Sequence, residues 1–140
     1  MESIMYTHKV QYYETDKMNC VHHSNYIRWF EEARTWLMDQ GGFGYAQMEE
    51  LGVMSPVLKA QAEYRSMTRF GETVEIETQV ESYTGTRIAF SYVVRDKASK
   101  AVRCLGRTEH CFLGKGGKPI SLKKACPPYH QRISEVLSAK

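Results

Sequence analysis

The residues best suited to catalysis lie close together near the N-terminus of the chain. They are a carboxylate, two imidazoles and two small polar residues at the expected start of a helix: Asp16, His22, His23, Ser24 and Asn25. The side chain of Ser24 or Asn25 could accept a hydrogen bond from free N–H groups of the first helical turn. A helix N-terminus carries partial positive charge, so it can polarise a carbonyl group. A carboxylate and a site that polarises a carbonyl group are the two groups that acyl transfer requires at least.

Other side chains in the same segment could also do chemistry, but each has a more ordinary role. Cys20 could be a nucleophile beside the histidines, although a small loop or interface side chain is the commoner role. His22 and His23 could bind a metal, but adjacent residues point in different directions, and ligand pairs usually sit about two to four residues apart. Glu31 or Glu32 could supply a carboxylate from the helix, although a solvated helix face is simpler. We therefore expect neither a metal nor a cofactor.

Length and composition predict one globular domain that spans residues 1–140. The chain is 42% hydrophobic and 25% charged, which is typical of a folded domain that needs no disulfides. A net charge of +3, with basic residues scattered among acidic ones, does not indicate nucleic-acid binding. We find no signal segment and no membrane span, so we expect a cytoplasmic protein. The cysteines have no CxxC spacing and are expected to be free thiols: Cys20, Cys104, Cys111 and Cys126.

The hydrophobic pattern changes from period two to helical spacing at the catalytic segment. Residues 4–13 alternate and predict a strand that ends just before Asp16. Apolar residues then recur at helical spacing and predict a long helix for a sheet to wrap: Tyr26, Trp29, Phe30, Ala33, Trp36 and Leu37. Gly41 and Gly42 predict its end, and residues 45–51 predict one or two further helical turns.

The rest of the chain is rich in strand patterns. Four segments alternate between apolar and polar side chains, so each should have one dry face and one wet face: 57–66, 73–83, 87–96 and 101–113. Short turns between the last three imply antiparallel neighbours. Residues 114–128 read as a flexible linker, and 129–138 as a C-terminal helix. This order predicts an α+β fold, an antiparallel sheet of about five strands around one long helix.

Residues 12–34, YYETDKMNCVHHSNYIRWFEEAR, resemble a known family signature. The segment contains, in order, an aromatic strand end, an acid-T-D motif, V-H-H, N-Y and an aromatic helix ending in E-x-A-R. This pattern is similar to that of the 4-hydroxybenzoyl-CoA thioesterase-like group of hotdog-fold proteins, and specifically to that of the YbgC-type acyl-CoA thioesterases. Residues 55–78, SPVLKAQAEYRSMTRFGETVEIET, continue the resemblance more weakly. The family usually has glycine where this chain has Met18 and Asn19. Because Asn tolerates left-handed backbone geometry, the turn should survive.

The resemblance implies a hotdog fold and hydrolysis of an acyl-CoA thioester, or of an acyl carrier protein thioester. By position, Asp16 matches the catalytic carboxylate, as nucleophile or general base, and His23 matches a supporting residue at the helix entry. The backbone N–H near His23 and Ser24 would polarise the thioester carbonyl, and we assign substrate binding to Ser24, Asn25 and Tyr13. The family further implies a homodimer or homotetramer with active sites at a subunit interface.

Two questions stay open at the level of the sequence. Several cations could hold the phosphates of coenzyme A, although most are expected to be simply solvated: Arg65, Arg69, Lys115 and Lys118. The alternative function is a non-catalytic hotdog module that binds acyl-CoA or only assembles with partners, because the altered turn at Lys17 to Asn19 could spoil the site.

Overall fold

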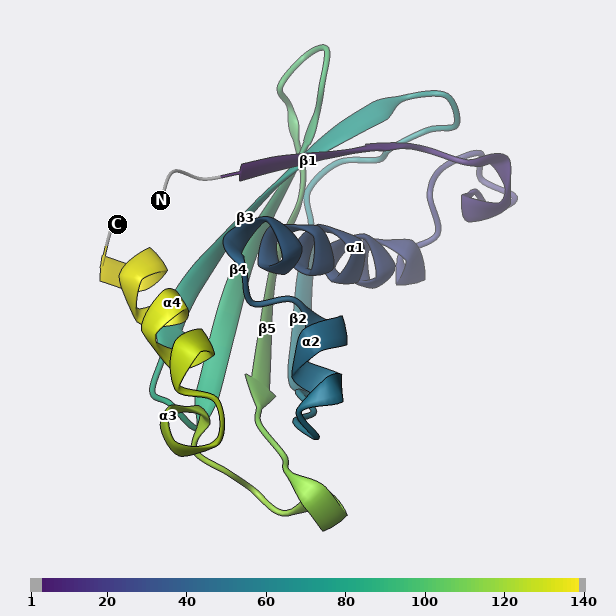
Figure 1. Cartoon of the computed structure of the whole chain (residues 1–140). Helices are drawn as coiled ribbons and strands as arrows, with labels where there is room; N and C mark the ends of the chain where they lie inside the picture. Colours follow the sequence, from purple (N-terminus) through teal and green to yellow (C-terminus); the bar gives the residue numbers. More distant parts are fainter. Residues whose placement is uncertain (1–3, 139–140) are drawn as a thin grey trace.

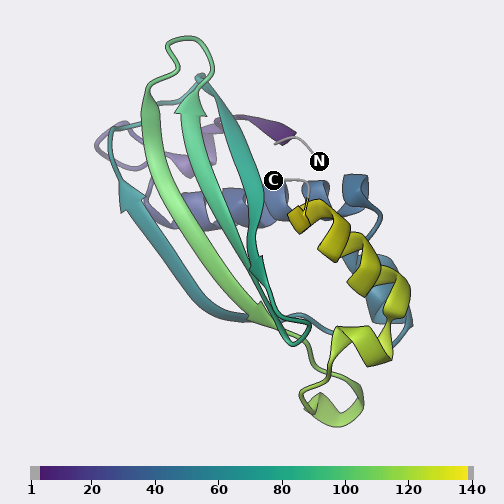
Figure 2. The same cartoon turned by 90° about the vertical axis from the view of Figure 1, so that its left-hand side faces the viewer.

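The computed structural model describes residues 4–138 as a five-stranded antiparallel sheet with the helices on one side (Figures 1 and 2). The strands follow the order β1-β3-β4-β5-β2. Their bounds are β1 Ile4–Lys9, β2 Val57–Tyr64, β3 Thr73–Tyr83, β4 Arg87–Asp96 and β5 Val102–Cys111. The helices are α1 Ser24–Gly41, α2 Tyr45–Glu50, α3 Leu122–Ala125 and α4 Pro127–Ser138, with short 3-10 turns η1 Tyr12–Glu14 and η2 Lys115–Gly117. The predicted α+β class is confirmed.

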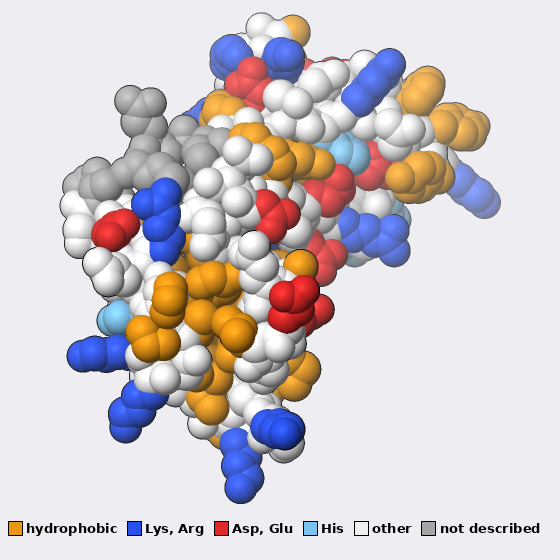
Figure 3. Space-filling model, in the orientation of Figure 1, with side chains coloured by type: hydrophobic (Ala, Val, Ile, Leu, Met, Phe, Trp, Pro, Cys, Tyr) orange, Lys and Arg blue, Asp and Glu red, His pale blue; other side chains and the backbone are white. Residues whose placement is uncertain are grey.

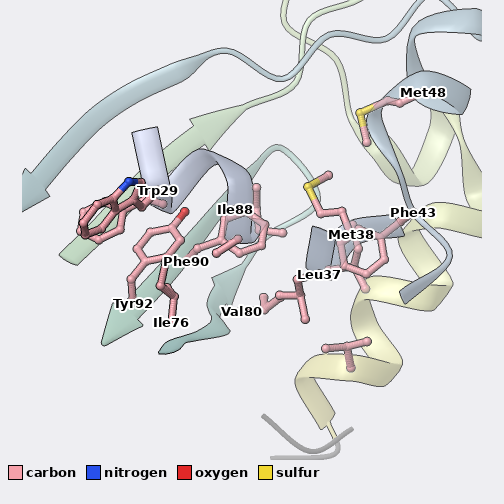
Figure 4. Close-up of a cluster of buried hydrophobic side chains, with 14 of the residues drawn as sticks. Trp29, Leu37, Met38, Phe43, Met48, Ile76, Val80, Ile88, Phe90 and Tyr92 are labelled. Atoms are coloured by element: carbon pink, nitrogen blue, oxygen red, sulfur yellow. The ribbon is translucent and has the colours of Figure 1, made fainter. Parts of the chain in front are cut away.

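Helix α1 fills the concave face of the sheet, as its apolar stripe predicts. Trp29 and Phe30 are fully buried, and the ring of Phe30 stacks on that of Tyr92 from β4 with centroids 4.4 Å apart. Figure 4 shows this cluster between α1 and the strands. Burying a side chain of this size stabilises a fold by about 1.5–3 kcal/mol, so the stripe fixes the helix on the sheet. The helix ends at Gly41, and its C-cap residue Gly42 has a φ of 82°, the left-handed conformation that glycine adopts without strain.

Strands β3 and β4 carry the core, whereas β2 does not follow the predicted alternation. Alternate side chains of β3 are buried from Val74 to Val80. In β2 seven of the eight residues are exposed and one is half-buried, so the expectation of a dry face is wrong for this strand. This strand pairs only with β5 and forms one edge of the sheet. An unpaired edge with apolar side chains is a surface suited to another chain.

Two further segment boundaries differ from the prediction. Strand β1 ends at Lys9 rather than Tyr13, because the carboxylate of Glu14 folds back to accept a hydrogen bond from the Gln11 N–H (2.8 Å), which favours the turn η1. The predicted flexible linker 114–128 instead contains η2 and α3, and α4 begins at Pro127. Proline suits the first turn of a helix because its missing N–H needs no partner there.

Candidate active site

The loop between η1 and α1 is a tight, hydrogen-bonded turn that presents Asp16. The Asp16 N–H donates to the carbonyl oxygen of Cys20 (2.9 Å), and the Asn19 N–H donates to the carbonyl oxygen of Asp16 (3.0 Å). Asn19 has a φ of 62°, so the residue expected to replace glycine does adopt the left-handed conformation. One carboxylate oxygen of Asp16, Oδ1, accepts a hydrogen bond from the Met18 N–H at 2.8 Å. The turn therefore holds this carboxylate in one orientation.

A second carboxylate, Glu14, anchors the loop to the core. Only 3% of Glu14 is exposed, and its oxygens accept hydrogen bonds from Trp29 Nε1 (2.7 Å) and the Gln11 N–H (2.8 Å) and lie 2.8 Å from His8 Nε2. Burial raises the pKa of Glu14, but these hydrogen bonds outweigh burial and hold it below the ordinary value of 4.5. Glu14 therefore remains a buried anion that ties the loop to α1.

The start of α1 differs in one respect from the sequence-based expectation. His23 is the N-cap residue, and Ser24 and Asn25 lie inside the helix without capping it through their side chains. Asn25 is buried and its Nδ2 donates to the carbonyl oxygen of Glu14 at 2.9 Å, while Ser24 Oγ lies 2.9 Å from His22 Nδ1. These side chains brace the loop, and the expectation that one of them caps the helix is wrong.

The backbone N–H of His23 is the free donor at this helix start. The Ser24 N–H donates to His22 Nδ1 (3.2 Å), and the Asn25 N–H donates to the carbonyl oxygen of His22 (3.0 Å). Within residues 4–138, no group accepts a hydrogen bond from the His23 N–H. An unpaired N–H at a helix N-terminus can bind a carbonyl oxygen and stabilise negative charge that develops on it.

Asp16 and His23 line one pocket of about 370 Å³ between this loop and the end of β2. The loop and helix supply Asp16, Met18, Cys20, Val21, His23 and Tyr26, and the strand end supplies Tyr64, Arg65, Ser66 and Met67. The predicted site residues Tyr13, Ser24 and Asn25 are not among these lining residues. Tyr13 is 77% exposed on η1, at the end of the molecule where Figure 3 shows exposed hydrophobic side chains.

Apart from Arg65, which was a candidate phosphate ligand, sequence reasoning missed the strand wall of this pocket. The Tyr64 hydroxyl donates to the carbonyl oxygen of His23 (3.4 Å), and its ring lies 5.5 Å from that of Tyr26. Residues 64–67 are about forty positions from the loop, so no local spacing links the two segments. The rings of His22 and His23 stack with centroids 4.2 Å apart, so these neighbours point the same way, contrary to expectation.

Cys20 lies in the pocket wall, 7% exposed, with its thiol directed at the Asp16 carboxylate. The distance from Cys20 Sγ to Asp16 Oδ1 is 3.8 Å, within the range of a weak sulfur hydrogen bond. The thiol thus helps to hold Oδ1 beside the Met18 N–H. This supporting contact agrees with the expectation that Cys20 is a small packing side chain. A positioned carboxylate and a free N–H, on two residues that line one pocket, are elements of an acyl-transfer site.

Comparison with known proteins identifies the family. A model of the thioesterase-like superfamily matches residues 10–136. The chain belongs to the thioesterase-like superfamily. A Staphylococcus aureus DHNA-CoA thioesterase structure superposes with a TM-score of 0.93 and 32% identity, and the match covers 99% of this chain and 93% of that one.

Curated relatives of this thioesterase-like chain agree with that structure. YneP of Bacillus subtilis, which carries the provisional name acyl-CoA thioesterase, is 35% identical over 122 residues, covering 87% of this chain and 88% of YneP. Acyl-CoA thioester hydrolase YbgC of Escherichia coli is 30% identical over 83 residues, covering 59% of this chain and 62% of YbgC. The predicted hotdog fold and the predicted enzyme class, a thioester hydrolase, are thereby confirmed. None of the helices within residues 4–138 is long and apolar enough to cross a membrane.

Proposed function

We propose that this chain hydrolyses acyl-CoA thioesters in the pocket lined by Asp16 and His23. One observation carries the proposal: a residue with an oriented carboxylate, Asp16, and a residue with an unpaired N–H at a helix N-terminus, His23, line the same pocket. The names of YneP and YbgC, both given as acyl-CoA thioesterases or hydrolases, support coenzyme A as the thiol carrier. A thioester on an acyl carrier protein is the alternative substrate. Free cysteines throughout residues 4–138 suit a reducing, cytoplasmic location.

In this mechanism the thioester carbonyl oxygen accepts a hydrogen bond from the His23 N–H. As the carbonyl carbon is attacked, negative charge grows on that oxygen, and the helix N-terminus stabilises it. Asp16 either attacks the carbon directly, giving a mixed anhydride that water then cleaves, or takes a proton from the attacking water. The electron pair of the broken C–S bond leaves with sulfur as a thiolate. Because a model thiol has a pKa of about 8.5, this leaving group needs no strong acid.

The imidazole of His23 has a supporting role in this proposal. Its ring is exposed, stacks on His22, and meets the edge of the Tyr64 ring with centroids 6.1 Å apart. We assign it to positioning water or assisting proton transfer beside Asp16. Its backbone donor does not depend on the side chain. Replacing the imidazole should therefore cost much less activity than replacing the Asp16 carboxylate.

One of the candidate phosphate ligands lies in this pocket, and two other residues brace the catalytic turn from outside it. Of the four candidate phosphate ligands, Arg65 lines it, and its 3.1 Å ion pair with Glu63 is exposed and therefore weak. Arg65 is thus free to bind a phosphate oxygen. Arg69 Nη1 instead donates to the carbonyl oxygen of Asn19 at 3.3 Å, which braces the catalytic turn. Asn25 acts in the same indirect way, through its hydrogen bond to the backbone of Glu14.

The exposed edge strand β2 supports a homodimer. Its apolar side chains are about half exposed, including Val57 (50%), Leu58 (48%) and Tyr64 (49%). A second copy pairing with this edge would bury them and satisfy the free backbone groups of β2. Because Tyr64 also lines the Asp16 pocket, the partner would border the active site. A further pairing of dimers would give the tetramer that the family resemblance implies.

The decisive experiment measures free-thiol release from short, long and aromatic acyl-CoAs. Asp16→Asn keeps the size of the side chain and removes its charge, so we expect a loss of about 100-fold or more in kcat. His23→Ala should retain most of kcat because the N–H donor remains. The matched control is Asp39→Asn, which makes the same change at an exposed position near the end of α1.

Two outcomes would contradict the proposal. All variants must share the wild-type melting temperature and oligomer size for the rates to be compared. Activity that survives Asp16→Asn refutes the proposed role of Asp16. If the wild type binds acyl-CoA but hydrolyses none of the panel, the chain is an acyl-CoA-binding module instead, and Asp16 is structural.

A further inference from the structure

The most exposed hydrophobic side chains of the protein lie at one end, beside the Asp16 pocket. Tyr13 (77% exposed), Tyr12 (76%) and Met18 (68%) are the three most exposed large hydrophobic residues within residues 4–138. Phe70 (55%), from the segment between β2 and β3, joins them, because its ring packs edge-on against that of Tyr12 with centroids 5.6 Å apart. We call these four residues the aromatic tip. Exposed apolar residues that lie together, rather than singly, mark a contact surface.

The aromatic tip projects from the body of the fold. The turn η1, which carries Tyr12 and Tyr13, is the purple segment at the right-hand end of the molecule in Figure 1. Figure 3, in the same orientation, shows hydrophobic side chains standing out at that end. The turn follows β1, which forms the opposite edge of the sheet from β2. The proposed pairing of β2 with a second copy therefore takes place at the other edge of the sheet.

Hydrogen bonds join the two segments that carry the aromatic tip. The Val21 N–H donates to the carbonyl oxygen of Thr68 (2.8 Å), and Arg69 Nη1 donates to the carbonyl oxygen of Asn19 (3.3 Å). Thr68 is fully buried, so this connection is part of the folded body. The aromatic tip is therefore a preformed surface, and a partner can bind it without first ordering the two segments.

The exposed charges around the aromatic tip are positive. Lys17 and Arg69 are exposed, and within residues 4–138 neither side chain forms an ion pair. The carboxylates of the same segments offer little opposition: Glu72 pairs with Arg103 at 3.3 Å, and Asp16 is half-buried in its pocket. An exposed apolar group with unpaired cations beside it attracts a partner whose surface is anionic.

The composition of the aromatic tip favours a lipid surface over an acidic protein. Tyrosine, phenylalanine and lysine are side chains that proteins place at the boundary between membrane and water. A tyrosine ring can enter the headgroup region while its hydroxyl stays hydrated. One side of a stable protein–protein interface uses about 20–30 residues, many more than the four of the tip. A projecting tip of this size therefore fits the headgroups of an anionic bilayer.

We propose that the aromatic tip docks this protein on an anionic lipid surface. The rings of Tyr12, Tyr13 and Phe70 enter the headgroup region, and Lys17 lies beside the lipid phosphates. Docking requires no turnover and is tested without a thioester. Its consequence for catalysis rests on the proposed function: Met18 belongs both to the tip and to the wall of the Asp16 pocket. The docked protein presents this pocket to the lipid surface, where long-chain acyl-CoAs accumulate because their chains are apolar.

The test measures cosedimentation of the full chain with lipid vesicles. One set of vesicles contains phosphatidylcholine alone, and the other contains phosphatidylcholine with an equal amount of phosphatidylglycerol. We expect the partition coefficient on the anionic vesicles to be at least about tenfold larger than on the neutral ones. We also expect it to fall in high salt, which screens the attraction between the cations and the lipid.

The variants locate the contact. Tyr12→Ser/Tyr13→Ser removes two exposed rings and should weaken binding to anionic vesicles at least about tenfold, and Tyr13→Ser alone at least about threefold. Lys17→Glu should weaken binding at least about fivefold, since each cation near an anionic surface contributes about that factor. The matched controls are Leu51→Ser, at a side chain that is 61% exposed after α2, and Lys115→Glu, at an exposed position in η2. Both should stay within about twofold of the wild type.

The results are compared among variants that keep the wild-type melting temperature, and Tyr13→Ser alone decides if the double variant does not. No binding of the wild type to anionic vesicles overturns the proposal, and so does an equal loss in the tip variants and the controls. A change of oligomeric size with Tyr13→Ser shows that a second copy covers the tip and overturns it as well. Asp16→Asn should bind vesicles at least as tightly as the wild type, so failure of docking and failure of the proposed thioesterase activity are separate results.

Discussion

The buried histidine His110 makes the stability of this fold depend on pH. Its side chain is fully buried on β5, with Nε2 2.8 Å from Thr108 Oγ1. Burial, with the charge of Arg34 second, lowers its pKa from 6.5 to about 4. Between these two values the unfolded chain binds a proton that the folded chain does not. Stability is therefore full above pH 6.5, falls as the pH drops below 6.5, and stops falling near pH 4.

The size of this effect follows from the two pKa values. For a single group with this shift, the free energy of unfolding falls by about 2 kcal/mol between pH 7 and pH 5, and by about 3 kcal/mol at pH 4. The assay is urea unfolding at several pH values for the wild type and for His110→Gln, which keeps a neutral polar side chain but does not titrate. Other ionisable groups cancel in the difference between the two curves. Parallel curves from pH 7 to pH 4 would refute the assigned pKa and the field of Arg34 behind it.

Substitutions at three further positions test the packing and the loop, each by urea unfolding. A methyl group at Gly106 would collide with the buried ring of Phe30, so Gly106→Ala should cost about 1–3 kcal/mol. Because Asn19 has a positive φ, Asn19→Ala should cost about 1 kcal/mol, whereas Asn19→Gly should be nearly neutral; equal effects would contradict this. Trp29→Phe removes the Nε1 donor of the buried Glu14 carboxylate and should lower the free energy of unfolding by about 2–3 kcal/mol. A loss of less than about 1 kcal/mol would show that this hydrogen bond is unimportant.

The fold could be predicted from the sequence wherever one face of an element is buried and the other is not. The bounds of β3 and β4 agree with the alternating segments 73–83 and 87–96, because period-two patterning reports burial directly. The same rule failed for β2. The sequence of β2 alternates, but its burial does not: only Ala62 is partly covered, although the strand pairs with β5 along one edge.

The candidate site could be predicted only in its local part. Asp16 and His23 line one pocket because they are only seven positions apart, on either side of a short turn. The opposite wall, from Tyr64 to Met67, depends on how β2 pairs with β5 and on how α1 lies across the sheet. Such non-local contacts leave no spacing in a single sequence. The buried environment of Arg34 was invisible for the same reason, since a charged residue on an amphipathic helix is expected to face solvent.

Two carboxylates two residues apart, Glu14 and Asp16, have environments that suit opposite roles. Glu14 is 3% exposed and accepts from Trp29 Nε1 and a backbone N–H, so its lone pairs are occupied and a substrate cannot reach it. Asp16 is half-buried and lines the pocket, and within residues 4–138 only its Oδ1 has partners. The second oxygen, Oδ2, is thus available to a water molecule or a carbonyl carbon. The turn can hold Asp16 by one oxygen and offer the other because Glu14 fixes the turn itself to the core. We therefore expect Glu14→Gln to reduce kcat mainly by displacing Asp16, with a matching loss of stability, whereas Asp16→Asn should reduce kcat at unchanged stability.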